Sequence, residues 1–271
     1  KHRTLIQKPI STNYLGKKIF TAPPNSQGLA LIYLCEYFKK HKQFLKKIDI
    51  YDYIKNKKKA FKIRDLYCVD PQIYKIKNKF TEILNQNNYK QKINGDTSTL
   101  VTVDKMGNAV CWVQSLFEEF GSGIVSPTTG IVLHNRLYLE KITGKYKNLL
   151  RPNKRPFHTL CPSIVLNNNK LDLVISTPGD HGQSQTIFQI INFIYKQKYN
   201  IQNAINLPRI RHNNGNQILV EKGFKKNFTN IKKVKLKIYK NKDRIFGGVT
   251  AIKINKNGTL SKGADKRRFC Y

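Results

Sequence analysis

Residues 95–104 have the sequence GDTSTLVTVD, in which a run of Thr, Val and Leu, residue types common in strands, follows an acidic residue. A turn at Lys105–Asn108 separates this run from a second apolar run at Ala109–Leu116. Two such runs joined by a short Gly-containing turn predict an antiparallel hairpin, with strands over Thr97–Asp104 and Ala109–Leu116. The chain is therefore expected to be β-rich from Thr97 onward.

Thr97, the first residue of that hairpin, is a candidate nucleophile. If the Asp96–Thr97 bond is cut, a hydroxyl and a new α-amino group belong to one residue, and the amine can act as base for the hydroxyl. An α-amino group titrates near pH 8 and so exchanges its proton at neutral pH, whereas a lysine titrates at about 10 and would need burial. The alternative is a strand threonine with a structural role only.

Several further segments accompany this junction in a fixed order. They are PIS at 9–11, APPNSQG at 22–28, NKRPFHTLCP at 153–162, STPGD at 176–180, AINLPR at 204–209, VEKG at 220–223 and GAD at 263–265. Each is weak alone, but in this order and spacing they resemble the gamma-glutamyltranspeptidase family of N-terminal-nucleophile hydrolases. The region between about Glu36 and Asn94 has no recognisable match.

The resemblance implies an α+β fold, a four-layer αββα sandwich. Residues 1–96 would be the C-terminal part of a large subunit, ending in a flexible connector at Gln86–Gly95, and residues 97–271 the small catalytic subunit. It also implies self-cleavage at Asp96–Thr97, which would leave two fragments of one precursor as a heterodimer. The only methionine is Met106, so we expect the chain to be processed or incomplete at its N-terminus.

Hydrophobic periodicity predicts the other elements. The predicted helices are Gly28–His41, Gln183–Tyr195 and Ile201–Leu207, and the predicted strands are Ser163–Leu166, Leu171–Ser176, Gln217–Glu221 and Val249–Ile254. The lysine-rich stretch 42–91 is expected to form only short helices and loops, such as Ile48–Ile54.

The resemblance also nominates groups around Thr97. Ser115 on the neighbouring strand, or Thr99 on the same face as Thr97, would orient the attacking oxygen, and both are equally explained as ordinary strand hydroxyls. Gly179 and Asp180 match a loop whose backbone N–H groups stabilise an oxyanion. Asp180 replaces a second glycine there, so its backbone must reach the same geometry with a side chain attached. A plain Pro-Gly turn is the alternative.

The substrate side of the predicted site departs from well-known transpeptidases. There, the segment matching Arg136 holds a substrate ammonium, but Leu139 stands at the acidic position and Phe117 at that of a binding asparagine. An arginine fork suits a carboxylate, and His158-Thr159 replaces a serine pair. These changes resemble the branch that contains oxamate amidohydrolase. A surface salt bridge is the alternative for Arg136, and solvent-exposed turn polarity is the alternative for His181 and Gln183 beside the loop.

The formal net charge is +34, from 50 Lys and Arg against 16 Asp and Glu. The lysines are scattered and no RNA-recognition or zinc-finger signature accompanies them, so no specific nucleic-acid partner is predicted, whereas acidic substrates are favoured. Lys57–Lys59 and Lys225–Lys242 are expected to be solvated faces.

Five cysteines without a CxxC pair argue against a disulfide framework or a zinc site, and most are expected to be buried thiols in a reducing, cytoplasmic compartment. We predict no metal and no cofactor. No apolar run approaches the roughly 18 residues of a membrane span.

Three interpretations remain open from the sequence. The first is an amidohydrolase or acyltransferase of γ-glutamyl amides, such as glutathione, working through an acyl ester on Thr97. The second keeps this mechanism but acts on a small acidic amide such as oxamate. The third is not an enzyme: a decayed or truncated homologue, or a lysine-rich binding module.

Overall fold

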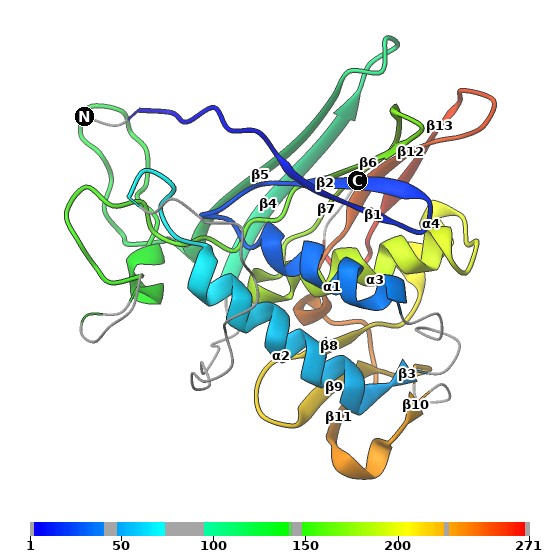
Figure 1. The fold of residues 1–271 in the computed structure, drawn as a ribbon. Coiled ribbons are helices and arrows are strands. Elements are labelled where there is room, and N and C mark those ends of the chain that lie inside the picture. Colours follow the sequence, from blue (N-terminus) through cyan, green and yellow to red (C-terminus); the bar gives the residue numbers. More distant parts are fainter. Residues whose placement is uncertain are drawn as a thin grey trace.

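The computed structural model describes residues 3–40, 48–73, 95–140, 142, 148–224 and 228–268. At its centre is a six-stranded sheet built from both ends of the chain. In spatial order its strands are β1 (Ile10–Tyr14), β2 (Lys17–Thr21), β6 (Ser163–Asn167), β7 (Lys170–Ser176), β12 (Thr250–Ile254) and β13 (Leu260–Ala264). All neighbours are antiparallel, and the β2–β6 pairing joins the N-terminal hairpin to the region that follows Thr97 (Figure 1).

Four helices cover one face of this sheet (Figure 1). They are α1 (Gly28–Lys40), α2 (Ile50–Tyr67), α3 (Gln183–Tyr195) and α4 (Ile201–Asn206). Helix α3 packs against both β7 and α1, and all of its residues are buried. Its apolar face, which includes Ile187, Ile190 and Ile191, forms the main core together with Leu31 and Leu34 of α1.

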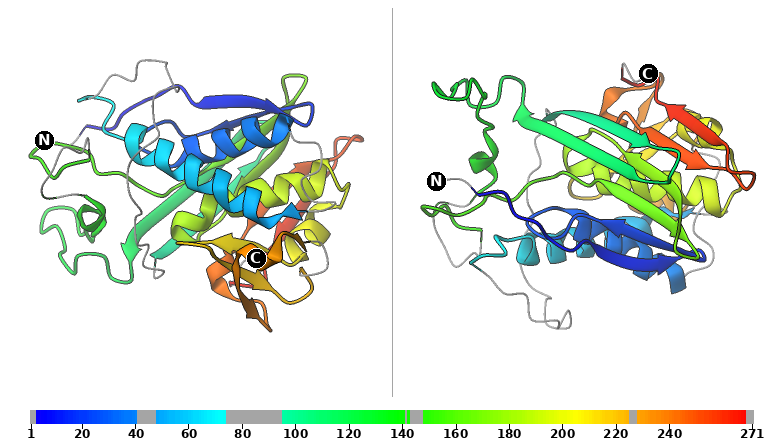
Figure 2. Two further views of the ribbon diagram at one scale, coloured as in Figure 1. Left: turned by 60° about the horizontal axis from the view of Figure 1, so that its bottom comes forward. Right: turned by 90° about the horizontal axis from the view of Figure 1, so that it is seen from above.

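The hairpin of β4 (Gly95–Val103) and β5 (Ala109–Glu118) covers the opposite face of the sheet, where it packs on β7 and β12 (Figure 2). The Asp104 carboxylate closes its turn by accepting hydrogen bonds from the N–H groups of Met106 (2.9 Å) and Asn108 (2.8 Å). Helices, a sheet and a second pair of strands are thus stacked in that order. The α+β class is confirmed, and these are three of the four predicted αββα layers; the described residues place no α-helix layer over the hairpin.

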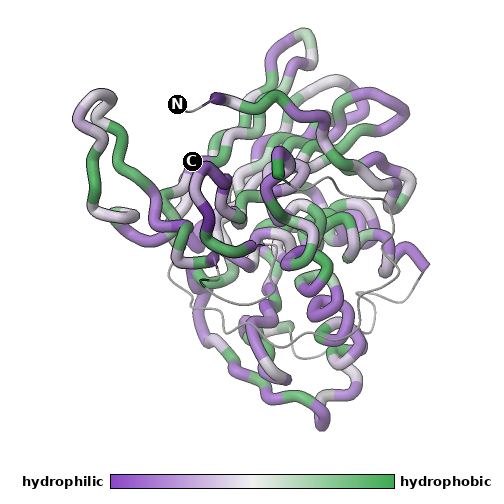
Figure 3. The backbone as a smooth tube through the Cα atoms, turned by 60° about the vertical axis from the view of Figure 1, so that its left-hand side comes forward, coloured by the Kyte–Doolittle hydropathy of each residue, from purple (hydrophilic) through white to green (hydrophobic). Residues whose placement is uncertain are grey.

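A smaller three-stranded sheet lies beneath the helices, in the order β11 (Lys235–Tyr239), β9 (Gln217–Glu221) and β8 (Ile210–His212). Two-residue strands β3 (Ile48–Asp49) and β10 (Phe228–Thr229) pair beside it. Short 3₁₀ turns are η1 (Arg136–Leu139), η2 (Asp180–Gly182), η4 (Ile231–Lys233) and η5 (Arg244–Phe246). In Figure 3 hydrophobic residues recur along the helices and central strands, while hydrophilic residues dominate many of the loops.

The elements predicted from periodicity are confirmed to within two residues at their ends, and α3 and β9 have the predicted bounds. The prediction of short helices and loops near Ile48–Ile54 is wrong, because α2 runs for 18 residues from Ile50. Asp49 caps it by accepting from the N–H of Asp52 at 3.0 Å. Its many lysines obscure the apolar stripe that packs on α1. The predicted connector lies outside the described residues, except for Gly95 at the start of β4.

The predicted solvation of the lysine runs is correct for the exposed lysines of β11 and wrong for Lys57, which is 2% exposed. Cys35, Cys68 and Cys161 are buried, as predicted, while Cys111 is half-buried and Cys270 lies outside the described residues. Among the residues with described positions, no helix is long and apolar enough to cross a membrane.

Candidate active site

Thr97 lies at an irregularity of the β4–β5 ladder. The pairing register shifts between Asp96 and Ser98, so that Thr97 faces two residues of β5, Ser115 and Leu116. Bulges of this kind bend a strand and re-aim its side chains, and they are common beside active sites. Thr97 is 8% exposed, and its strand packs against η2. The strand that carries Thr97 therefore lies against the short turn at Asp180–Gly182.

The two hydroxyls predicted to support Thr97 have different surroundings. Ser115 lies across from Thr97, and its Oγ accepts a hydrogen bond from the Phe117 N–H at 2.9 Å. Thr99 instead forms a 3.0 Å hydrogen bond between its Oγ1 and that of Thr250 on β12. The Thr99 hydroxyl thus joins the hairpin to the central sheet, whereas Ser115 remains the neighbour of the candidate nucleophile.

The loop at 176–183 connects β7 to α3 and is entirely buried. Two consecutive residues in it have left-handed backbone angles, Gly179 at φ +126° and Asp180 at φ +55°. A side chain at Gly179 would also approach the Gly247 Cα to 3.3 Å. Asp180 therefore adopts a glycine-type backbone although it has a side chain, which Asp tolerates better than most residues. The exposed-turn alternative for His181 and Gln183 is wrong, since both side chains are buried.

Gln27, at the start of α1, connects this loop to the opposite wall of the site. Its Nε2 donates to the Asp180 carbonyl at 2.9 Å and to the Thr159 carbonyl, and it is fully buried. Two backbone hydrogen bonds, at 3.1 Å each, join His158 to the residues just before α1: the Gln27 N–H donates to the His158 carbonyl, and the His158 N–H donates to the Asn25 carbonyl. Residues 25–27 thus connect the 158–159 segment to the Asp180 loop.

His181 is held in one neutral form by Arg64 of α2. The Arg64 Nη1 lies 2.9 Å from the His181 Nδ1. A guanidinium can only donate, so Nδ1 accepts and the ring proton belongs to Nε2, which faces the Asp180 Oδ1 at 3.7 Å. Burial lowers the pKa of His181 well below its usual value, and the charges of Arg64 and Arg211 lower it further.

The Asp180 carboxylate has cations near it, but none of them is close enough for a short ion pair among the described residues. Its Oδ2 lies 3.9 Å from the Arg211 Nη2, beyond hydrogen-bond distance, and neither oxygen has a hydrogen-bond partner within the part of the chain that the structure describes. Burial raises the pKa of Asp180 to about 6, although the charge of Arg211, the backbone N–H of His181 and the charges of Arg64 and Arg136 each favour its charged form.

Arg136, on η1, lies in the interior at 3% exposure, so the surface salt-bridge alternative is wrong. Its Nη1 donates to the Thr159 Oγ1 at 3.4 Å, and its guanidinium lies 5.4 Å from the Phe117 ring centre. Its Nη2 is buried and has no hydrogen-bond partner among the described residues. Burial lowers its pKa to about 10, against the opposite effect of Asp180. Arg136 thus stays charged at neutral pH, and its Nη2 has no acceptor among the described residues.

His158 adds a neutral ring to the same wall. Burial lowers its pKa to about 3, and the nearby charges of Arg136 and His134 lower it further. Its Nδ1 is buried and lacks a hydrogen-bond partner within the described ranges. Leu139, which stands at the position of the acidic residue in well-known transpeptidases, packs into a small apolar cluster with Phe117 and Phe157. This wall therefore offers Arg136 and His158 to a ligand, and no carboxylate at position 139.

The chain matches the model of the gamma-glutamyltranspeptidase family over residues 1–269. It belongs to that family. A glutathione hydrolase-like proenzyme of Bacillus subtilis, YwrD, is 29% identical over 98% of this chain and 55% of its own length. An oxamate amidohydrolase proenzyme of Klebsiella pneumoniae is 38% identical, over 42% of this chain and 22% of its own length.

Solved structures of family members and related acylases have the same fold. A cephalosporin acylase of Bacillus halodurans superposes with a TM-score of 0.80 at 26% identity, over 96% of this chain and 51% of that one. A gamma-glutamyltranspeptidase of Pseudomonas nitroreducens gives 0.55 at 25% identity, over 64% of this chain and 96% of that one. This family member therefore has the α+β fold of N-terminal-nucleophile hydrolases, and it spans about half the length of YwrD and of the acylase.

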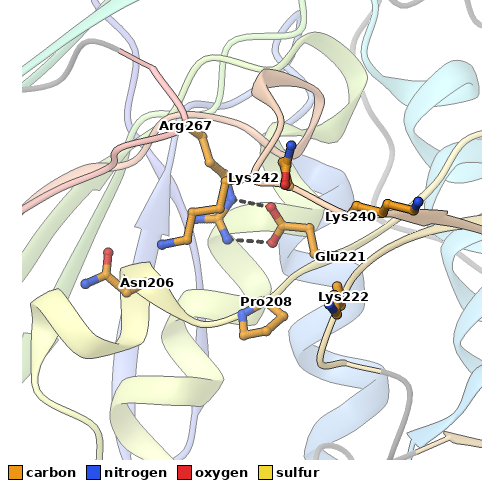
Figure 4. Close-up of a pocket in the computed structure, with 8 residues that line it drawn as sticks. Asn206, Pro208, Glu221, Lys222, Lys240, Lys242 and Arg267 are labelled. Carbon is orange, nitrogen blue, oxygen red and sulfur yellow. Dashed lines mark hydrogen bonds and ion pairs between the residues drawn. The ribbon is translucent and has the colours of Figure 1, made fainter.

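A second group of buried charges lies away from this site. The Arg267 guanidinium binds both oxygens of Glu221, at 2.7 and 2.5 Å, beside a pocket of about 230 Å³ that Lys222, Lys240 and Lys242 also line (Figure 4). Asp265 bridges Arg267 to Arg209 behind it. All Arg267 nitrogens are used in these bonds and in bonds to backbone carbonyls. The Arg267 guanidinium thus joins β9, α4 and the C-terminal end of the described chain.

Sequence reasoning missed three residues of the site: Gln27, Arg64 and Arg211. Gln27 belongs to a matched segment, so its position alone could have nominated it. Arg64 lies in the stretch without a recognisable match, and Arg211 lies 31 positions beyond Asp180. Both reach the loop only because α2 and β8 pack beneath it.

Proposed function

We propose that this protein is an N-terminal-threonine amidohydrolase or acyltransferase acting on γ-glutamyl amides, with Thr97 as nucleophile after cleavage of the Asp96–Thr97 bond. The observation that carries the proposal is the position of Thr97, at a bulge whose strand packs against the turn of Gly179 and Asp180. The packing of β4 on η2 supports a site shared by the matched nucleophile and the matched loop, which are 82 positions apart in sequence. The term "proenzyme" in the names of several relatives supports the cleavage.

In the proposed reaction the Thr97 hydroxyl attacks the amide carbonyl carbon, and its own α-amine takes the hydroxyl proton. The negative charge that forms on the carbonyl oxygen is stabilised by the backbone N–H groups of Gly179 and Asp180. The C–N bond then breaks, the leaving amine receives the proton, and the acyl group remains as an ester on Thr97. Water, or a second amine, attacks this ester and regenerates the hydroxyl.

The self-cleavage step is tested by intact mass and N-terminal sequencing of the full-length protein. We expect two fragments, the smaller beginning Thr-Ser-Thr-Leu, and a single uncleaved, inactive chain for Thr97→Ala. Thr99→Ala is the matched control, because Thr99 is a threonine of the same strand and face whose hydroxyl bonds to Thr250. A wild-type chain that stays intact, or a Thr97→Ala chain that cleaves, would overturn the assignment.

The second candidate is hydrolysis of a small amide that carries its own carboxylate, as oxamate does. The observation that favours it is Arg136, whose buried Nη2 has no partner among the described residues, beside the Thr159 hydroxyl. A guanidinium of this kind suits a carboxylate. The discriminating assay compares a γ-glutamyl anilide with oxamate, each with the wild type and Arg136→Gln. Turnover of neither substrate by a cleaved protein would remove both substrate classes.

The heterodimer of two fragments from one precursor is part of the same proposal. Strands β1 and β2 precede Thr97 and pair with each other, and β2 also pairs with β6, which follows Thr97, so cleavage would leave the central sheet spanning both fragments. The two pieces would stay together through this sheet and the core beneath it.

A further inference from the structure

We infer that Arg211 is the positioning residue for the Gly179–Asp180 peptide, whose N–H stabilises the oxyanion in the function proposed above, on which this inference rests. Arg211 lies on β8 and is buried at 3% exposure. In Figure 1 the sheet of β8, β9 and β11 lies below the 176–183 loop and the β4–β5 hairpin above it. Arg211 on β8 and Thr97 on β4 thus belong to different sheets of the molecule.

The Gly179 carbonyl is held by two donors. It accepts from the Arg211 Nη1 at 3.0 Å and from the Gly182 N–H at 2.8 Å. The same Arg211 nitrogen also donates to the Ile245 carbonyl at 2.7 Å, which fixes the guanidinium itself. A trans peptide is planar, so its carbonyl and the next N–H point in opposite directions. Arg211 therefore turns the Asp180 N–H away from β8 and toward the side where β4 lies.

The Asp180 side chain is linked to the same guanidinium. Its Oδ2 faces the Arg211 Nη2 at 3.9 Å, while its Oδ1 faces the His181 Nε2 at 3.7 Å. The charge of Arg211 favours the ionised form of this buried carboxylate and so offsets part of the cost of burying it. One arginine thus contacts the backbone before Asp180 and attracts the carboxylate of Asp180.

Gly182 leaves the space that Arg211 occupies. A Cβ at this position would lie 2.9 Å from the Arg211 Nη1 and 3.0 Å from its Cζ. The Gly182 backbone has ordinary helical angles, φ −79° and ψ −15°, which alanine adopts without strain. Gly182→Ala therefore displaces the guanidinium while it changes no charge and no hydrogen-bonding group of the loop.

The structural test compares crystal structures of the full-length wild type, Arg211→Gln and Gly182→Ala. We expect the wild-type Gly179 carbonyl to point at Arg211, and the peptide to be rotated or to occupy two orientations in both variants. A single unchanged orientation in both variants would overturn the inference. Because the crystal structures show the orientation of the Gly179–Asp180 peptide directly, they test the role of Arg211 even if the protein cleaves neither itself nor an amide.

The kinetic test uses whichever of the two amides the wild type turns over. Losing one oxyanion donor lowers kcat by about 10²–10³-fold, so displacing rather than deleting it should lower kcat by about 10–100-fold with KM nearly unchanged. Arg209→Lys is the matched control: it alters a buried arginine two positions away that bonds to Ile205, Phe246 and Asp265 but not to the loop. It should reduce stability and leave kcat per folded molecule unchanged.

A double variant separates positioning from simple charge neutralisation. If Arg211 only compensates the Asp180 charge, Asp180→Gly in the Arg211→Gln background restores kcat. If Arg211 orients the peptide, that double variant stays as slow as Arg211→Gln, because the Gly179 carbonyl still lacks the arginine as one of its two donors. Full restoration would therefore contradict the positioning role, whereas an inactive wild type with an oriented loop would count only against the proposed function.

Discussion

The protein buries two arginine–carboxylate networks of different completeness. The Asp265 network comprises Arg209, Glu221, Asp265 and Arg267, and the Asp180 network comprises Arg64, Asp180, His181 and Arg211. Asp265 is bound by two arginines, at 2.6 and 3.1 Å, and by the N–H groups of Val249 and Arg267 at 3.0 Å each. Asp180 has two cationic or ring nitrogens at 3.7–3.9 Å and no hydrogen bond from the described residues.

The two aspartates are almost equally buried, at 1% and 3% exposure, yet their pKa values move in opposite directions. Burial would raise both. In Asp265 the charges of Arg209 and Arg267 and the backbone N–H donors outweigh burial, so the pKa falls. In Asp180 burial dominates and raises the pKa to about 6. The two carboxylates thus differ in how closely their charged partners approach, at 2.6 and 3.1 Å in Asp265 and at 3.7 and 3.9 Å in Asp180.

The largest effect is expected when the complete network loses its central charge. Asp265→Asn leaves Arg209 and Arg267 buried without their shared carboxylate, and we expect it to reduce the free energy of unfolding at pH 7 by about 3–5 kcal/mol. Because the folded-state pKa of Asp265 is lowered, its contribution is present above the ordinary value and is lost as the pH falls through the folded-state pKa. Urea unfolding at pH 7 measures the first effect, and comparison of pH 4 with pH 2 measures the second.

The matched control is Glu119→Gln, at an exposed pair in which Glu119 lies 3.8 Å from Arg244. Exposed pairs contribute roughly 0–1 kcal/mol, so this variant should unfold almost as the wild type does. Equal losses for the two variants at pH 7 would show that completeness of hydrogen bonding does not set the strength of the Asp265 network.

The incomplete network should respond with the opposite sign. Asp180→Asn removes a charge that the fold disfavours, so we expect the variant to be more stable than the wild type at pH 7. A raised pKa means that the favourable, protonated form is fully populated below about 4, and that wild-type stability is lost as the pH rises through about 6. The stability gain should therefore be near zero at pH 4 and reach on the order of 2–3 kcal/mol above pH 7.

Urea unfolding of the wild type and of Asp180→Asn at pH 4, 5, 6 and 7 checks this prediction. Ser98→Ala, an exposed strand position, serves as a control that should show no pH-dependent difference. A gain that is flat with pH, or a loss at pH 7, would mean that Asp180 is better compensated than its distances indicate.

The two networks also show what the sequence could and could not predict. The hairpin at Thr97 and helix α3 follow from local periodicity, and the left-handed backbone at Asp180 follows from matching it to a glycine. Neither network was predictable, because its members come from elements brought together only by packing. Arg64 lies on α2, whose many lysines prevented recognition of this helix from the sequence. Asp265 lies 56 positions from Arg209. Their burial depends on which helix face meets the sheet, which a lysine-rich sequence does not show.

The smallest effect is expected at Lys57, which the sequence places in a run of three lysines and the fold places beside the Asp180 network. Its Nζ donates to the Asn213 carbonyl at 3.1 Å and lies 3.7 Å from the Phe61 ring centre. Burial lowers its pKa well below 10.5, and Arg64 and Arg211 lower it further. The fold therefore disfavours its charged form, and Lys57→Met should raise the free energy of unfolding at pH 7 by about 1 kcal/mol or less.

The sign with pH follows from the lowered pKa of Lys57. Its protonation costs stability at low pH, and that cost disappears as the pH rises past the folded-state value, so the gain of Lys57→Met should shrink between pH 7 and pH 10. Lys59→Met, at an exposed position of the same run, should change stability at neither pH. A gain for Lys57→Met that persists unchanged at pH 10 would come from apolar packing on Phe61 instead. Burial of the Lys57 charge beside Arg64 and Arg211 would then cost no stability, and only the Asp180 carboxylate would be poorly compensated in this network.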